Sequence, residues 1–125
     1  MELDTKETDA AQVLTPMADR IDAASAIQFK DAVRAATADG PDRVVLDLGN
    51  VRFVDSSGLG AIVSSMKHLG QGRKMDLAAL NPDVDKVFRL TRMDSVFTIY
   101  KDIEAATVVD TGMETGMETG AGRAS

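Results

Sequence analysis

The stretch RVVLDLGNVRFVDSSGLGAIVSSMKHLG, residues 43–70, predicts a strand, a tight turn and a helix in direct succession. Residues 44–48 form a nearly continuous apolar run, which is typical of a strand covered on both faces. Residues 51–54 continue in an extended pattern. Beyond the turn, apolar residues recur at spacings of three and four, which predicts one buried helix face: Leu59, Ile62, Val63, Met66 and Leu69. The rest of the fold is expected to form around this unit.

The turn Asp55-Ser56-Ser57-Gly58 supplies three candidate N-caps in a row. One capping side chain is enough for a helix, so two serines behind an aspartate leave a surplus hydroxyl. Gly58 and Gly60 keep the first turn thin, so other backbone can approach it. The positive end of the helix dipole favours phosphate or an acidic group. The turn is therefore a candidate site of modification or contact, with capping alone as the alternative.

The sequence patterns that indicate strands and helices are weaker in residues 1–40, ahead of this unit. Residues 1–10 are polar and are expected to be loose. Residues 12–14 predict a short strand that Pro16 confines to an edge or ends. Residues 17–21 predict a second short strand. Residues 23–40 predict a helix.

That helix has one apolar face, formed by Ala26, Phe29, Val33 and Ala36. Asp22 or Ser25 could cap its N-terminus. Ile27 lies off the apolar face, so it is expected to be exposed and is a candidate partner contact.

Downstream, residues 75–79 alternate apolar with polar or small residues, which predicts a half-buried strand. A helix is predicted from Pro82, a residue favoured in a first turn. Its inward face is expected to comprise Val84, Val87, Phe88 and Thr91. Residues 97–100 predict a last strand and residues 103–109 a last helix. The tail, residues 110–125, repeats TGME and is expected to be disordered.

Alternating strands and helices predict a single α/β domain with a mixed sheet and right-handed crossovers. The folded part is expected to run over residues 11–109. Apolar residues make up 44% of the chain but aromatic ones only 4%, so aliphatic side chains and methionine must build the core.

The overall charge narrows the classes of partner. A net charge of −6 argues against a nucleic-acid backbone as partner and against docking on anionic lipid.

The absence of cysteine excludes disulfides and thiolate chemistry. No apolar run approaches the roughly 18 residues of a membrane helix, and the acidic N-terminus lacks the apolar region of a signal peptide. The expected location is the cytoplasm.

The spacing of Ser57 and His68 argues against a catalytic role for the serines. A Ser–His mechanism needs an imidazole within hydrogen-bond reach, and His68 lies about 16 Å along the predicted helix from Ser57. Gly70 to Lys74 resemble a phosphate loop, but they follow a helix and precede a strand, the reverse of the required order. Asp47, at a strand end, could be the phosphoacceptor of a receiver domain, but the first strand lacks the acidic pair that receivers need. One histidine and no cysteine leave no metal cluster beyond a weak all-carboxylate one.

Three segments together resemble the STAS-domain family, specifically bacterial anti-sigma factor antagonists. RVVLDLGNVRFVDSSGLGAIV is similar to the family's strand followed by its DSSGLG phosphorylation motif. RIDAASA, residues 20–26, resembles the segment GRLDAATA, and LTRMDSVFTIY, residues 90–100, resembles the closing LTGLDRLFPVY. Asp19 and Arg92 stand where the family usually has glycine. The resemblance spans residues 12–109 and implies a curved mixed sheet backed by helices.

The resemblance also implies a partner-switching role without catalysis by this chain. The unmodified protein would bind a serine kinase that doubles as the anti-sigma factor, and phosphorylation of Ser57 would release it. A phosphatase of the PP2C type would restore the unmodified form. No cofactor is expected, because ATP and Mg²⁺ would belong to the kinase. The residues predicted to contact the partner are Asp22, Ser25, Ile27, Asp55, Ser56, Ser57 and Gly58.

Two alternatives within the same fold remain. The chain could be a non-switching adaptor bound to a transporter ATPase, although an adaptor need not keep a phosphorylatable serine. Its final target could also be another signalling enzyme, of the two-component or cyclic-nucleotide kind, instead of a sigma factor.

Overall fold

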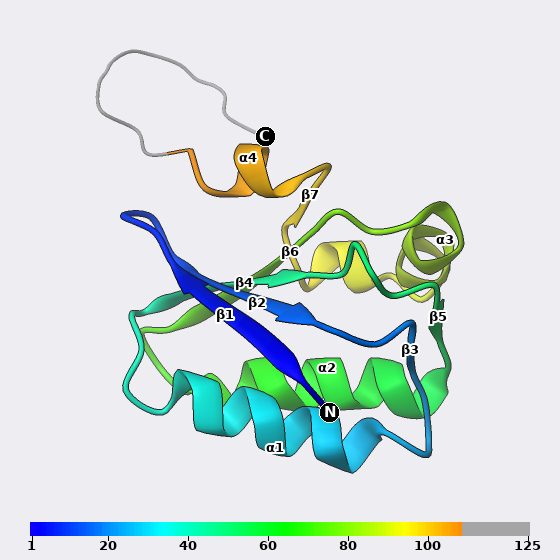
Figure 1. Ribbon diagram of the computed structural model, residues 1–125. Coiled ribbons are helices and arrows are strands. Elements are labelled where there is room, and N and C mark those ends of the chain that lie inside the picture. The colour runs from blue at the N-terminus through cyan, green and yellow to red at the C-terminus, as the bar shows by residue number, and fades with distance from the viewer. Residues whose placement is uncertain (109–125) are drawn as a thin grey trace.

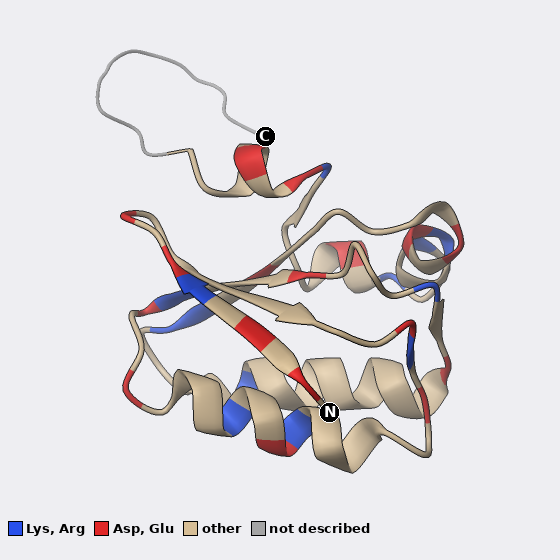
Figure 2. Ribbon diagram, in the orientation of Figure 1, with Lys and Arg blue, Asp and Glu red and all other residues tan. Residues whose placement is uncertain are grey.

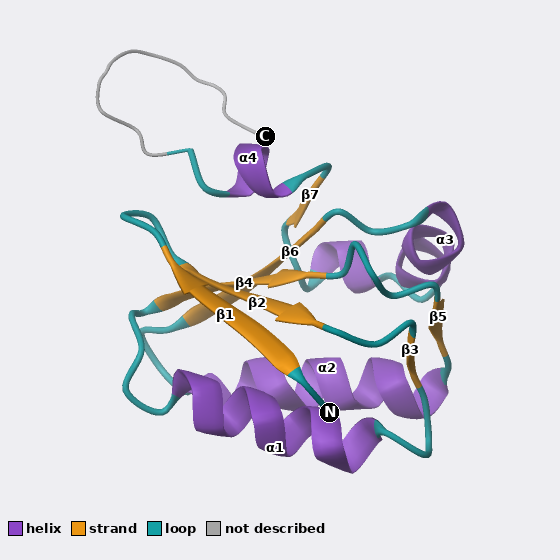
Figure 3. Ribbon diagram, viewed as in Figure 1, coloured by secondary structure: helices purple, strands orange, loops and turns teal. Residues whose placement is uncertain are grey.

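Five strands form one mixed sheet in the order β1-β2-β4-β6-β7 in the computed structural model, which describes residues 1–108 (Figure 1, Figure 3). They are β1 (Leu3–Glu7), β2 (Gln12–Pro16), β4 (Arg43–Asp47), β6 (Lys74–Ala78) and β7 (Ile99–Tyr100). β1 runs antiparallel to β2, and the other pairs are parallel. A second, two-stranded parallel sheet joins β3 (Arg20–Ile21) to β5 (Phe53–Val54). The α/β class and the mixed sheet predicted from the sequence are confirmed.

Two helices, α1 (Ala26–Thr37) and α2 (Ser56–Leu69), lie side by side on one face of the large sheet (Figure 1). The helix α3 (Pro82–Leu90) and the 3₁₀ helix η1 (Met93–Ser95) follow β6, and α3 packs near β5. The short helix α4 (Ile103–Ala106) packs against β6 and β7. Within residues 1–108 no helix is long and apolar enough to cross a membrane.

The central strand β4 is buried on both faces, as its unbroken apolar run predicts. Val44 and Leu46 join the main core with Phe29, whereas Val45 joins a smaller cluster on the opposite face with Ala106. This alternation follows from the two-residue period of a strand. The sheet therefore has one heavily covered face, under α1 and α2, and one lightly covered face, under α4.

The lightly covered face holds a buried ion pair that the sequence analysis did not predict. Asp76 is 0% exposed, and its Oδ2 accepts hydrogen bonds from Arg43 Nε (3.0 Å) and Nη2 (2.8 Å). Arg43 Nη1 also donates to the carbonyl of Ala106 (2.6 Å), and the Arg43 guanidinium lies 5.6 Å from the ring centroid of Tyr100. One arginine thus joins β4, β6, β7 and α4.

The expectation that residues 1–10 are loose was wrong. Leu3–Glu7 form β1, paired along β2 from Leu3 opposite Pro16 to Glu7 opposite Gln12. The free edge of β2 offers backbone hydrogen-bonding groups, and these pair with the first segment although its side chains are mostly exposed. A strand held mainly by its backbone carries little apolar periodicity, which explains the error.

Other boundaries and faces differ in detail. β6 is buried on both faces, because Asp76 is paired, and is not half-buried as predicted. Thr91 is exposed, and its hydroxyl donates to the Val87 carbonyl (2.7 Å) instead of packing inward. The strand predicted at residues 17–21 is confined to Arg20–Ile21. The last helix ends at Ala106, and Val109 and the predicted tail, residues 110–125, lie outside the described residues.

Candidate functional site

Asp55 caps helix α2. Its backbone is extended (φ −94°, ψ −174°), and its Oδ1 accepts a hydrogen bond from the Gly58 N–H at 2.9 Å. Ser56 and Ser57 are exposed, and their hydroxyls take part in none of the side-chain hydrogen bonds within residues 1–108. Of the three candidate caps, the aspartate therefore does the capping, and both serine hydroxyls are left at the positive end of a 14-residue helix.

Gly58 holds the first turn of α2 against β3. The residue is buried, and a Cβ atom at this position would overlap the carbonyl oxygen of Ile21. Only glycine lets the two backbones approach this closely. Gly58 was predicted as a contact residue, but its buried position gives it a packing role that fixes where the neighbouring serines lie.

The loop that precedes α1 lies beside this helix end and is built on Asp22. Asp22 Oδ1 accepts hydrogen bonds from the Ala24 N–H (3.1 Å) and the Ser25 hydroxyl (3.2 Å). The Ser25 oxygen in turn accepts from the Asp22 N–H at 3.1 Å. Asp55 Oδ2 accepts from the Ala23 N–H at 3.3 Å, so one carboxylate connects the two loops. These residues, distant in sequence, form one surface.

The side chain of Arg20 borders this surface and was not among the predicted site residues. Its guanidinium lies 5.1 Å from the ring centroid of Phe53, and its Nη1 lies 3.4 Å from Asp22 Oδ2. Both Arg20 and Phe53 are exposed. They are brought together by the parallel pairing of β3 with β5, in which Arg20 lies opposite Phe53. No local sequence pattern predicts the pairing of β3 with β5.

The predicted exposure of Ile27 is confirmed, since its side chain is 69% exposed in the first turn of α1. Leu59 was expected to be mainly core, and it is half-buried. The fully buried positions of α2 include Ala61, Ile62 and Ser65, so the buried face is turned relative to the predicted one. Ala61 and Ser65 are small, which allows α1 to pack closely against α2.

Asp19, a position where the resemblance implies glycine, still anchors its loop. The Asp19 carbonyl accepts hydrogen bonds from the N–H groups of Arg52 (2.7 Å) and Phe53 (3.2 Å). Arg92, the second such position, adopts the left-handed conformation with φ +63°, which normally favours glycine.

The arrangement provides exposed hydroxyls, and within residues 1–108 neither the Ser56 nor the Ser57 hydroxyl is hydrogen-bonded to the imidazole of His68. Ser57 lies in the first turn of α2 and His68 in the last, as the sequence spacing predicts. Within residues 1–108 no three histidine, aspartate or glutamate side chains are grouped so that they could hold a metal ion.

Comparison with protein families gives one match that spans the fold. The family model described as STAS domain matches residues 2–106, which include β1 and the capped helix α2. The match begins ahead of β1, consistent with the first strand being part of the domain.

Several proteins that are similar to this chain are named as anti-sigma factor antagonists. BtrV of Bordetella bronchiseptica, assigned by its name to the anti-sigma factor antagonists, is 33% identical over 87 residues, which cover 69% of this chain and 75% of BtrV. RsfB of Mycobacterium tuberculosis, an anti-sigma-F factor antagonist, is 27% identical over 86 residues, covering 69% of this chain and 70% of RsfB. The crystal structure of an anti-sigma factor antagonist from Mycobacterium paratuberculosis superposes with a TM-score of 0.75 at 27% identity, covering 84% of this chain and 89% of that one.

Proposed function

This chain belongs to the STAS-domain family, and from that membership we propose that it is an anti-sigma factor antagonist that works by partner switching. The unphosphorylated chain binds an anti-sigma factor that is also a serine kinase. Phosphorylation of Ser57 separates the two proteins, and a PP2C-type phosphatase reverses the modification. ATP and Mg²⁺ are bound by the kinase, and the exchange takes place in the cytoplasm. The chain itself contributes binding and a phosphoacceptor, not catalysis.

The observation that carries this proposal is that Asp55 caps α2 and leaves the Ser57 hydroxyl exposed. Asp55 already satisfies the Gly58 N–H, so the cap does not occupy the hydroxyl of Ser57. Ser57 is exposed while the residue after it is fixed against Ile21. A kinase therefore meets a free hydroxyl on a rigid backbone. Ser56 is exposed as well, and the choice of Ser57 rests on its place as the second serine of the DSSG motif.

The surroundings of Ser57 explain how one phosphate can end a protein complex. The group adds about −1.5 to −2 charges at pH 7. The adjoining loops carry the carboxylates of Asp22 and Asp55, so the added charge enlarges an acidic surface that the partner must match. Burying this charge without matched cations costs several kcal/mol, and a loss of about 4 kcal/mol weakens binding roughly 1,000-fold.

The experiment is phosphorylation by the kinase that the chain captures from its native cell extract. Wild type, Ser57→Ala and Ser56→Ala are incubated with this kinase and ATP, and the products are followed by intact mass and fragment analysis. We expect one phosphate on wild type and on Ser56→Ala, located at Ser57, and none on Ser57→Ala. Phosphate only on Ser56, or only on a threonine of residues 110–125, overturns the assignment.

The same capture separates the alternatives inside the family. An adaptor would bring down a transporter ATPase, and its binding would not depend on the charge at position 57. A regulator of another signalling enzyme would show the Ser57 dependence but would release a target other than a sigma factor.

A further inference from the structure

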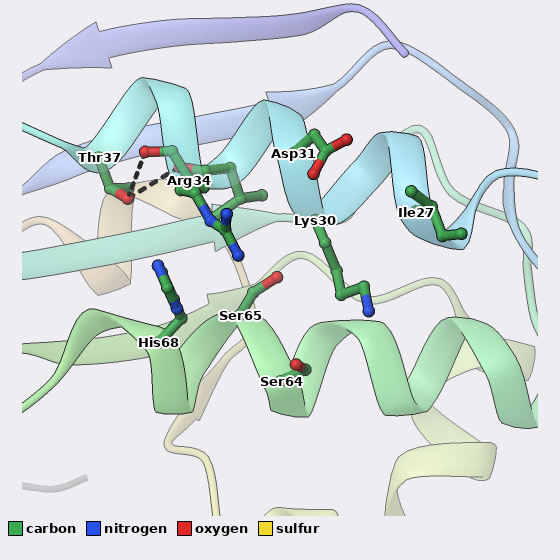
Figure 4. Close-up of a pocket in the computed structure, with 9 residues that line it drawn as sticks. Ile27, Lys30, Asp31, Arg34, Thr37, Ser64, Ser65 and His68 are labelled. Atoms are coloured by element: carbon green, nitrogen blue, oxygen red, sulfur yellow. Dashed lines mark hydrogen bonds between the residues drawn. The ribbon is translucent and has the colours of Figure 1, made fainter.

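A cavity of about 290 Å³ lies between α1 and α2, away from the serine turn (Figure 4). Its volume is close to the lower limit of about 300 Å³ for small-molecule pockets. Ile27 and Val33 supply apolar lining, and Ser64, Ser65 and His68 line it from α2. Phenylalanine, tyrosine and tryptophan are absent from the lining residues, so the apolar part of the lining is aliphatic.

Basic side chains of α1 point across this cavity. Figure 4 shows Lys30 and Arg34 extending from α1 towards Ser64, Ser65 and His68 of α2. Neither Lys30 nor Arg34 enters an ion pair within residues 1–108. Asp31 also lines the cavity, and with His68 neutral the lining carries a formal charge of about +1, from two cations and one carboxylate, in a chain of net charge −6.

Ser65 is a buried hydroxyl aimed into the cavity without a partner. The residue is 5% exposed, and its Oγ has no hydrogen-bond partner among the described residues. By contrast, the buried Thr37 hydroxyl at the end of α1 donates to the carbonyl of Val33 at 2.8 Å. A buried polar atom without a partner is uncommon, and a bound ligand is one way to satisfy it.

We propose that this cavity binds a small aliphatic organic anion, a phosphate ester or a carboxylate. The anionic group lies between the Arg34 guanidinium and the Ser65 hydroxyl, because a guanidinium donates two parallel hydrogen bonds to such groups. Lys30 adds a second positive charge, and the aliphatic part of the ligand packs on Ile27 and Val33. The cavity does not include Ser57, although it shares Ile27 with the predicted partner contacts, and ligand binding there goes beyond the proposed partner-binding role.

The test is an NMR titration of the full chain, labelled with ¹⁵N, at constant ionic strength. The probes are inorganic phosphate and glycerol 3-phosphate. We expect saturable shifts centred on the amides of Ser64, Ser65 and His68, with glycerol 3-phosphate binding more tightly than inorganic phosphate. Shifts that rise linearly without saturation, or that centre on Ser56 to Gly58, overturn the proposal.

Matched variants separate a built site from general charge attraction. Lys30→Gln and Arg34→Gln should each weaken glycerol 3-phosphate binding by about tenfold, because each removes one positive charge that faces the anion. Lys86→Gln makes the same charge change on an exposed position of α3 and should leave binding unchanged. Equal weakening by Lys30→Gln and Lys86→Gln would contradict the proposal.

Ser65→Ala tests the hydroxyl itself. This variant should weaken binding without lowering the melting temperature, because it removes a buried group that has no protein partner. A lower melting temperature with unchanged binding would instead show that the hydroxyl serves the fold, and would overturn its assignment to the ligand.

Discussion

The two aspartates Asp55 and Asp76 use the same carboxylate in opposite ways. Asp76 is fully buried and bonded to the side chain of Arg43, across the lightly covered face of the sheet. Asp55 is only partly buried and bonded to backbone N–H groups, at the edge where two loops meet. The first carboxylate fixes the packing of strands, and the second fixes a surface. Figure 2 shows how both acidic and basic residues are spread over the elements of an acidic chain.

This difference indicates where a charge can be added or removed without destabilising the fold. A change at Asp76 leaves its cationic partner behind in a mostly buried place. A charge added beside Asp55 meets water, free N–H groups and the positive end of a helix dipole. A switch that works by adding a phosphate therefore belongs at the second place.

The largest expected loss of stability comes from breaking the buried ion pair between Arg43 and Asp76. Asp76→Ala should lower the free energy of unfolding by about 3 kcal/mol, the lower end of the range for breaking a buried pair, because Arg43 keeps some exposure. Urea denaturation measures it. Asp85→Ala, which breaks the exposed pair with Arg89, is the control and should cost less than about 1 kcal/mol. Similar losses at the two sites would remove the contrast between buried and exposed carboxylates.

Gly58→Ala should follow in size, with a loss of about 1–3 kcal/mol, because the new Cβ overlaps backbone at Ile21 and not a movable side chain. Gly60→Ala is the matched control in the same helix. Apart from the backbone of its own helix and its chain neighbours, no atom lies within 4 Å of a Cβ built there, so this change should raise stability by about 0.5–1 kcal/mol. Thermal melting of the two variants gives both values. A neutral Gly58→Ala would show that the serine turn is not held by β3.

Asp55→Ala should cost about 1 kcal/mol through loss of the helix cap. Ser56→Ala should stay within about 0.5 kcal/mol of wild type, because its exposed hydroxyl has no partner among the described residues. Denaturant midpoints measured side by side compare the two. If Ser56→Ala were the more damaging, the cap would have been assigned to the wrong residue.

The smallest effect concerns Ser57→Asp, which should stabilise the chain by about 0.3–1 kcal/mol at low ionic strength. The gain should shrink as salt is added, since salt screens exposed charges. Melting curves at two salt concentrations check it. A drop of many degrees would mean that a charge at this position rearranges the domain.

The strand–turn–helix unit could be predicted because its signals are local. The apolar run of β4, the Asp55 cap and the spacing along α2 all lie within 28 consecutive residues, 43–70. The candidate site was predicted in the same way, since Asp55, Ser56 and Ser57 are neighbours in sequence and stay together at the helix end.

What could not be predicted depends on pairing between distant segments. Asp76 reads as the polar half of an alternating strand until Arg43, from another strand, is placed beside it. Arg20 and Phe53 meet only through the β3–β5 register. β1 owes its place to backbone bonds with β2, and its polar side chains gave no sign of it.

The central claim is that charge at position 57 ends partner binding while the fold stays intact. The most direct test measures the affinity of the captured kinase, with ADP present, for wild type, Ser57→Ala and Ser57→Asp by calorimetry, alongside their melting temperatures. We predict that Ser57→Ala binds as wild type does. Ser57→Asp should melt at or slightly above the wild-type temperature and bind at least about 100-fold more weakly, equivalent to about 2.7 kcal/mol. A Ser57→Asp protein that binds as tightly as wild type would contradict the claim.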